Sequence, residues 1–153
     1  MSATVAIDAA CELCRIDGGE ILWRDEFCRV VLAGDPDYPG FCRVILNRHV
    51  REMTDLPAAE RTRLMQVVFA TEAAVRALLA PDKVNLASLG NRVAHLHWHV
   101  VPRFRRDRHF PAPVWSPPAR ESGVAPAVDA ARLRQLLDPG ERLSAAGTMP
   151  TKP

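Results

Sequence analysis

His95-Leu96-His97-Trp98-His99-Val100-Val101 is a stretch in which histidines alternate with apolar residues. Successive side chains of a β-strand point to opposite faces, so a strand here places the three imidazoles on one face, about 6.5 Å apart along the backbone. The apolar side chains then face the core. An imidazole near neutral pH can attack phosphorus, donate a proton or bind a metal ion. The pattern therefore predicts a site for phosphoryl or metal chemistry.

The flanking segments predict an α+β fold: an antiparallel sheet of about five strands, a long helix packed on one face, and a short helix. Runs rich in β-branched and aromatic residues predict strands at 21–23, 27–32, 41–46, 83–88 and 94–101. Asp55 is placed to cap a helix whose apolar residues recur at helical spacing as far as Leu79, just before Pro81. In the remainder of the chain, the short helix is predicted at residues 128–137.

Composition bounds the organisation of the chain. With 153 residues, 48% of them hydrophobic, the chain suits one domain, which we place at 7–115. The Pro- and Ala-rich stretch 116–153 is expected to be a loosely attached, partly disordered extension. A net charge of +2 gives no broad basic surface for nucleic acid. The sequence has no apolar run of membrane-spanning length and no signal-peptide layout, so we expect a cytoplasmic protein without membrane contact.

The stretch from Asn85 to Arg103 resembles the signature of the histidine triad (HIT) family, which is His-φ-His-φ-His-φ-φ, with φ apolar, often followed by Pro-Arg. Upstream, 39–50 and the helix after Leu56 are similar to the family's strand, basic-His turn and helix. The resemblance covers about 11–115. It implies a HIT-like fold, a homodimer, and a purine nucleotide or nucleotide conjugate bound beside the histidines.

The resemblance also implies a chemistry. His97 matches the nucleophile that attacks the α-phosphorus of a nucleotide and forms a nucleotidyl-histidine, which water hydrolyses to a nucleoside monophosphate. His99 would assist His97, and His95 would support the edge of the site. The substrate would be a phosphoramidate or, as for diadenosine tetraphosphate hydrolases, a dinucleoside polyphosphate. Catalysis would need no cofactor. The expected phosphate-binding residues are Asn85, Ser88, Gly90, Asn91 and Arg92.

The sequence departs from the family pattern at three places. Many members have histidine after the glycine at position 40, where this chain has Phe41, and this puts catalytic rate in question. A nucleotide-binding regulatory module with little turnover is therefore an alternative function. Arg92 stands where relatives have Ser or Thr. The acidic residues that hold the ribose in relatives have no clear counterpart, since Ala33 and Gly34 lie near the expected place.

Two cysteines near the N-terminus suggest a zinc site separate from the histidine chemistry. Cys11-x-x-Cys14 has ligand spacing but supplies only two of the four ligands of a structural zinc site. His49 and His95 are candidates for the others, and some bacterial HIT proteins have a similar arrangement. Alternatively, both thiols are reduced and unligated. A metalloenzyme that binds zinc through the alternate histidines is a third functional class, but it would need a further ligand. The basic cluster 105–109 is expected to be a solvated loop.

Overall fold

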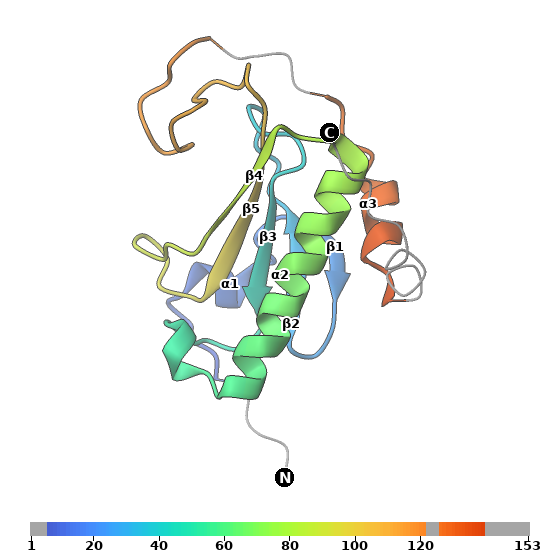
Figure 1. The fold of residues 1–153 in the computed structure, drawn as a ribbon. Helices are drawn as coiled ribbons and strands as arrows, with labels where there is room; N and C mark the ends of the chain where they lie inside the picture. Colours follow the sequence, from blue (N-terminus) through green and yellow to red (C-terminus); the bar gives the residue numbers. More distant parts are fainter. Residues whose placement is uncertain (1–5, 122–125, 140–153) are drawn as a thin grey trace.

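The computed structural model describes residues 6–121 and 126–139. Its centre is a five-stranded antiparallel sheet, which confirms the predicted fold class (Figure 1). In sheet order the strands are β1 (Glu20–Arg24), β2 (Cys28–Leu32), β3 (Cys42–Leu46), β5 (His97–Arg103) and β4 (Lys83–Ala87). The histidine-bearing strand β5 thus has a neighbour on each side, which fixes its register.

Strand β5 begins later than the sequence predicted. The expected strand over 94–101 instead runs from His97 to Arg103. The N–H of His95 donates to the carbonyl of Val93 at 2.8 Å, and this tight turn keeps His95 out of the regular ladder. His97 and His99 are therefore on the strand, whereas His95 lies at the turn that leads into it.

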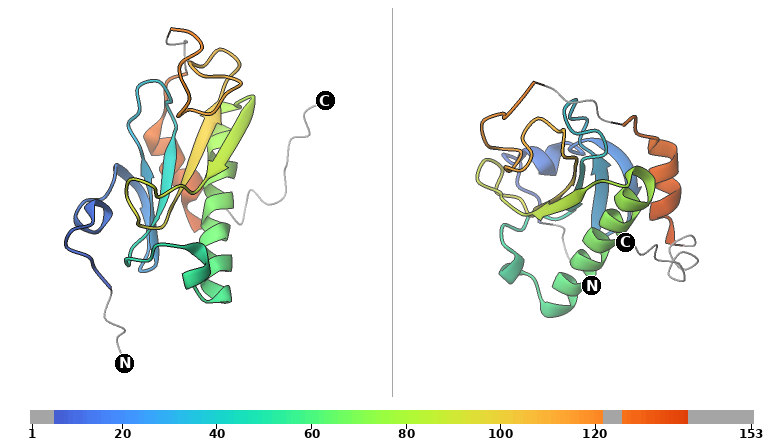
Figure 2. Two further views of the ribbon diagram at one scale, coloured as in Figure 1. Left: turned by 90° about the vertical axis from the view of Figure 1, so that its left-hand side faces the viewer. Right: turned by 45° about the horizontal axis from the view of Figure 1, so that its top comes forward.

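The predicted alternation on this strand is present. Leu96 and Val100 are buried in the main core, on the face of the sheet covered by α2 (Ala58–Leu79). Figure 2 shows α2 along this face and the N-terminal segment on the other. Helix α2 contributes Leu64, Val68 and Val75, all fully buried, to the same core. Burial of this apolar face leaves the opposite face of β5 for the histidines.

Asp55 does not cap α2. It ends a short 3-10 turn (Met53–Asp55), and its Oδ2 accepts the N–H of Glu52 at 3.3 Å. Pro57 then precedes α2 in an extended conformation. A residue before proline is sterically disfavoured in the helical region, so Leu56 breaks the continuity that the prediction assumed. The C-terminal end is as expected: Ala80 adopts a left-handed conformation with φ 45°.

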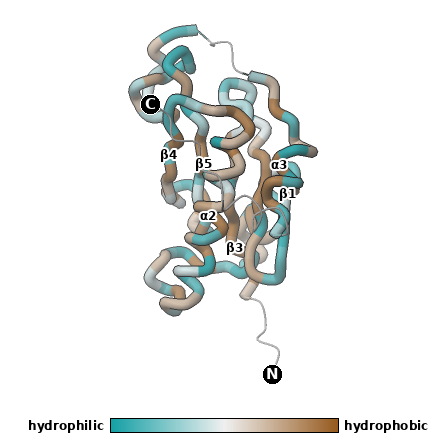
Figure 3. Tube along the Cα trace, turned by 45° about the vertical axis from the view of Figure 1, so that its right-hand side comes forward, coloured by the Kyte–Doolittle hydropathy of each residue, from teal (hydrophilic) through white to brown (hydrophobic). Residues whose placement is uncertain are grey.

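Helix α3 (Ala130–Leu137) corrects the expectation of a loosely attached extension for this part of the chain. Leu133 and Leu137 are fully buried, and α3 packs beside α2 and β1 (Figure 3). The helix is amphipathic, so burying its apolar face stabilises its attachment. Residues 122–125 and 140–153 lie outside the described residues. The domain boundary after 115 and the partial disorder of 116–153 stay predictions.

The N-terminal segment packs on the histidine face of the sheet. It contains α1 (Glu12–Arg15), and Cys11 and Leu13 pack against Val31 and Ile45. Arg29 ties this segment to β2, since its Nη2 donates to the carbonyl of Leu13 at 2.7 Å. These contacts hold the cysteine pair beside the start of β5. In the part of the chain that the structure describes, no helix is long and apolar enough to span a membrane.

Candidate active site

A cavity of about 540 Å³ lies against His97 and His99 on the histidine face of the sheet. This volume is within the usual range for small-molecule sites. Its lining includes three further residues predicted from sequence, namely Gly90, Asn91 and Arg92. It also includes Trp115, together with Glu12, Leu13 and Arg43, three residues for which the sequence predicts no role.

The backbone fixes the orientation of His97. Its Nδ1 lies 2.5 Å from the carbonyl oxygen of His95. A carbonyl oxygen can only accept a hydrogen bond, so Nδ1 carries the proton and Nε2 keeps its lone pair. Burial lowers the pKa of His97, the His95 carbonyl opposes this change, and the charge of Arg43 lowers the pKa further. The ring is therefore neutral near pH 7, as a nitrogen nucleophile requires.

His99 lies beside His97 with 4.9 Å between the two ring centroids. Burial, followed by the proximity of His97 and Arg43, lowers the pKa of His99 to about 4. Both imidazoles on β5 are consequently uncharged at neutral pH. They can accept or donate hydrogen bonds around a phosphate without repelling one another.

Phe41 forms an apolar wall behind His99. Its ring centroid is 5.4 Å from that of His99, and the side chain is buried in a small cluster with Tyr38 and Val101. A phenyl ring cannot transfer a proton. The departure from the family pattern therefore removes a titratable group at a position in direct contact with the histidine row.

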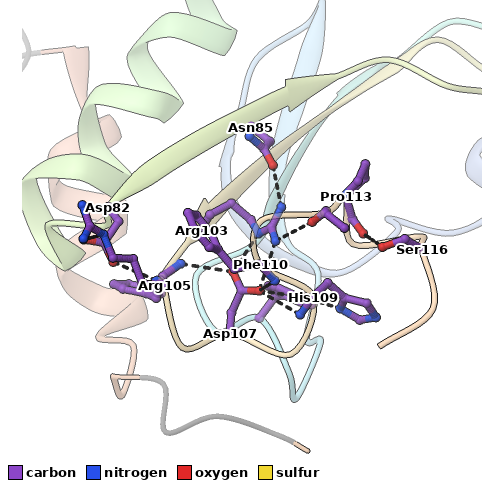
Figure 4. Close-up of polar contacts among 12 residues, drawn as sticks. Asp82, Asn85, Arg103, Arg105, Asp107, His109, Phe110, Pro113 and Ser116 are labelled. Carbon is purple, nitrogen blue, oxygen red and sulfur yellow. Dashed lines mark hydrogen bonds and ion pairs between the residues drawn. The ribbon is translucent and has the colours of Figure 1, made fainter. Parts of the chain in front are cut away.

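Two predicted phosphate-binding residues do not line the cavity. The Oδ1 of Asn85 accepts a hydrogen bond from Nη1 of Arg103 at 2.7 Å (Figure 4). The hydroxyl of Ser88 donates to the carbonyl of His97 at 2.9 Å, so Ser88 supports the backbone of the histidine strand. Gly90, by contrast, is at the cavity with φ 77°, a conformation that side-chain-bearing residues rarely adopt.

A buried polar network anchors the loop that follows β5. Arg103 donates from Nε and Nη2 to the two carboxylate oxygens of Asp107, at 2.7 and 3.0 Å (Figure 4). Burial raises the pKa of Asp107, but hydrogen bonds from Arg103 and from backbone N–H groups outweigh it and lower the pKa to about 2. His109 is buried, with Nδ1 2.5 Å from the hydroxyl of Tyr38. The expectation of a solvated loop at 105–109 is thus wrong for Asp107 and His109, because both supply the partners that buried Arg103 and Tyr38 need.

This anchored loop brings Trp115 to the cavity. Arg103 Nη2 also donates to the carbonyl of Ala112 at 2.8 Å, and the N–H of Ser116 bonds to the carbonyl of Pro113 at 3.0 Å. Trp115 is 60% exposed although it lines the cavity. Its position follows from the path of the loop, for which the local sequence offers no periodic signal.

The four predicted zinc ligands come together beside the cavity. Atoms of Cys11, Cys14, His49 and His95 that could bind a metal all lie within 4.8 Å of one another. His95 Nδ1 is 3.4 Å from Cys11 Sγ and 3.5 Å from Cys14 Sγ. With zinc bonds of about 2.0–2.3 Å, the edges of a tetrahedral site measure about 3.3–3.8 Å. Both separations between His95 and the cysteines fall within this range, and the donor set of two thiols and two imidazoles fits zinc.

A hydrogen bond orients His95 for metal binding, and a carboxylate lies near the ring of His49. Nε2 of His95 donates to the carbonyl of Leu46 at 2.7 Å, so Nδ1 directs its lone pair toward the two sulfur atoms. Nε2 of His49 lies 3.8 Å from a carboxylate oxygen of Asp8. A carbonyl that accepts from the second ring nitrogen, as that of Leu46 does here, commonly fixes the tautomer of a metal-binding histidine. His95 therefore faces the thiols and is fully buried, whereas His97 and His99 line the cavity.

The fold and the histidine row together define a histidine triad protein. The HIT domain family matches residues 18–106, more than half of the chain, and the chain belongs to this family. An uncharacterised HIT-like protein of Methanocaldococcus jannaschii is 27% identical over 106 residues, which cover 63% of this chain and 81% of that protein.

Solved structures agree with this assignment. A histidine triad protein from Marinobacter aquaeolei is 27% identical, with a TM-score of 0.68 over 86% of this chain and 97% of that one. A histidine triad family protein from Mycobacterium smegmatis, described as zinc-bound, is 23% identical, with a TM-score of 0.61 over 90% of this chain and 97% of that one. The HIT family comprises nucleotide-binding hydrolases and transferases.

Proposed function

We propose that this protein hydrolyses the bond between a nucleoside α-phosphate and its substituent through a nucleotidyl-His97 intermediate. The observation that carries the proposal is the hydrogen bond from His97 Nδ1 to the His95 carbonyl, which leaves Nε2 as a neutral nucleophile. His97 also lines a cavity of suitable size. The substrate is a phosphoramidate or a dinucleoside polyphosphate.

The proposed reaction has two steps, formation of the nucleotidyl-histidine and its hydrolysis. Nε2 of His97 forms a bond to the α-phosphorus, while the bond from phosphorus to the substituent breaks and its electron pair leaves with the substituent, which takes up a proton. Water then attacks the phosphorus and releases one proton, which balances the proton that the substituent took up, while the bond to Nε2 breaks, its electron pair returns to Nε2, and the nucleoside monophosphate is released. A covalent intermediate divides one difficult displacement into two easier ones. Asn91, Arg92 and the backbone at Gly90 are the proposed phosphate contacts in the cavity wall.

We assign zinc a structural role, held by Cys11, Cys14, His49 and His95. Four protein ligands close a tetrahedral site and leave no open position for substrate, whereas catalytic zinc keeps one. The donor geometry supports this assignment, as does the zinc-bound relative from Mycobacterium smegmatis. His95 then serves the metal and supplies its carbonyl to His97, while His97 and His99 carry out the chemistry.

One observation favours a second candidate function, a nucleotide-binding regulatory module with little turnover. Phe41 packs against His99 at the position where many family members have histidine. The cavity and the phosphate contacts are compatible with binding alone. The two functions share a site and differ in rate.

Three further assignments are part of the proposal: a homodimer and a purine nucleotide as ligand, which the family resemblance implies, and a cytoplasmic location, which is the expectation from sequence. Sedimentation equilibrium of the full chain tests the first, with a mass near twice 16.9 kDa expected. Competition between purine and pyrimidine monophosphates tests the second, and fractionation of cells tests the third.

The decisive experiment mixes the full-length protein with an adenosine phosphoramidate and, separately, with a dinucleoside polyphosphate. Monophosphate release should fall at least roughly a thousandfold in His97→Ala. Acid quench should trap a nucleotidyl adduct on the peptide that contains His97, and His99→Ala should retain the adduct at a lower rate. Nucleotide binding without turnover in any of these proteins would select the regulatory module. Turnover that is lost on chelation, in a metal-replete wild type that never yields a trapped adduct, would instead indicate metal catalysis.

A further inference from the structure

Arg43 lies on the same face of the sheet as the catalytic histidines. In the register of β3 against β5, Arg43 is directly opposite His99. Directly opposite residues in an antiparallel pair project from the same face. Arg43 also lines the same cavity as His97 and His99. A permanent positive charge therefore stands beside the proposed nucleophile.

The hydrogen-bond donors of Arg43 are largely unused by the protein. A guanidinium carries five N–H donors. Arg29, on the neighbouring strand, donates to Leu13, Ile16, Asp17 and Asn47, and so serves the fold. Arg43 makes one such bond, from Nη1 to the carbonyl of Gly18 at 3.0 Å. Among residues 6–121 and 126–139, no carboxylate forms an ion pair with Arg43.

Phe41 holds this guanidinium in place. The central carbon of the guanidinium is 5.4 Å from the centroid of the Phe41 ring, and the same ring contacts His99. Stacking against an aromatic ring orients a planar cation while leaving its edge free to donate. The ring of Phe41 thus packs against both Arg43 and His99. Phe41 itself is uncharged, and Arg43, two residues further along the chain on β3, provides a positive charge at this site.

The charge of the cavity indicates what Arg43 would bind. Arg43 and Arg92 line it against a single carboxylate, that of Glu12. A phosphoramidate of a neutral amine carries one negative charge at the α-phosphate, whereas each additional phosphate of a polyphosphate adds more. Arginine binds phosphate with paired, charge-assisted hydrogen bonds. A second cation beyond the histidine row is therefore better matched to a polyphosphate.

We propose that Arg43 binds a phosphate group of the leaving portion of the substrate and so selects nucleoside polyphosphates over phosphoramidates of neutral amines. This proposal rests on the proposed function, because it assigns the α-phosphate to His97. Arg43 is a binding and specificity residue and takes no part in the bond changes at phosphorus.

The test measures binding without turnover. The full-length His97→Ala protein is titrated with AMP, ADP and ATP by calorimetry at fixed ionic strength and without divalent cations. Affinity should rise with the number of phosphates. Adding Arg43→Leu should lower the affinity for ATP roughly tenfold to a hundredfold, the usual range for a hydrogen bond to a charged group. The affinity for AMP should fall less than about threefold. Arg43→Lys should retain part of the preference, since it keeps the charge but loses the paired geometry.

Arg76→Leu is the matched control, because it removes the same charge from an exposed position on α2, across the sheet from the cavity. It should leave the ATP to AMP ratio unchanged. Equal weakening of AMP and ATP by Arg43→Leu, or an effect no larger than that of Arg76→Leu, would overturn the proposal. A folding defect would lower the affinity for AMP, ADP and ATP alike. Circular dichroism of Arg43→Leu detects such a defect directly, and Arg43→Lys provides a second, more conservative variant.

A second measurement separates this proposal from the proposed function. In proteins with His97 intact, the ratio of kcat/KM for a dinucleoside polyphosphate to that for a phosphoramidate should fall in Arg43→Leu. If the wild type shows no turnover but the ATP preference depends on Arg43, the hydrolase proposal fails and the Arg43 proposal stands. If turnover depends on His97 but the substrate ratio is unchanged by Arg43→Leu, the hydrolase proposal stands and the Arg43 proposal fails.

Discussion

Nδ1 of His97 lies 2.5 Å from the carbonyl oxygen of His95, and Nδ1 of His95 in turn lies 3.4 Å from Sγ of Cys11 and 3.5 Å from Sγ of Cys14. The peptide segment that orients the proposed nucleophile is thus the segment that carries a proposed zinc ligand. Loss of the proposed metal would therefore affect turnover as well as stability, even though the proposed reaction does not use zinc.

This relationship predicts the effect of Cys14→Ser. We expect bound zinc, measured by elemental analysis, to fall from about one per chain to near zero. The free energy of unfolding should fall by several kcal/mol, because metal binding contributes directly to folding. Turnover should fall with it through the displaced carbonyl of His95. Cys42→Ala is the control: it also removes a buried sulfur, but it should keep the zinc. Wild-type protein purified under metal-replete conditions without zinc would contradict the assignment.

Phe41→His tests whether the departure from the family pattern limits turnover. The new imidazole would contact His99 from a position 5.4 Å away between ring centroids, and we expect kcat to rise by up to about tenfold. The buried polar ring should cost about 1–3 kcal/mol of stability, measured by urea unfolding. Phe41→Leu keeps the site apolar and should not raise kcat. An unchanged kcat in Phe41→His would show that Phe41 is not what limits the rate.

Asp107→Ala should destabilise the protein strongly. It leaves the guanidinium of Arg103, which is 2% exposed, without its carboxylate. Breaking a buried ion pair in this way costs about 3–5 kcal/mol. Because the same network positions the loop that carries Trp115, nucleotide affinity should fall as well. Asp82→Ala removes a carboxylate that lies 4.0 Å from Nε of the exposed Arg105 and accepts its backbone N–H at 2.9 Å, and it should cost no more than about 2 kcal/mol. Similar losses in the two variants would refute the anchoring role.

His99 predicts a dependence of stability on pH. Its pKa is about 4 in the folded protein and near 6.5 in the unfolded chain, so the unfolded state binds more protons between these values. Stability from this group is complete above pH 6.5 and is lost as the pH falls toward 4, by at most about 3 kcal/mol. Urea unfolding at pH 7.5 and pH 5 should show a smaller difference in His99→Asn than in wild type. Equal differences would exclude His99 as the cause.

The local pattern of the sequence was sufficient to predict the antiparallel sheet and which face of the histidine strand packs against the core. Alternation over 96–100 predicted which side chains enter the core, and Leu96 and Val100 do so. Such patterns succeed because strand periodicity and apolar burial act between residues a few positions apart. Asp55 was misassigned because the constraint that Pro57 places on Leu56 overrode a good capping residue.

The sequence by itself also placed the histidines, the cysteine pair and the HIT signature. The family resemblance already gave the histidines different expected roles, but only the tertiary structure placed His95 beside the thiols and His97 and His99 at the cavity. It likewise placed Arg43 and Trp115 in the cavity wall and Asn85 against Arg103. These assignments depend on register between strands and on a loop anchored by a buried ion pair. Both bring together side chains that are distant along the chain, and no local periodicity encodes such contacts.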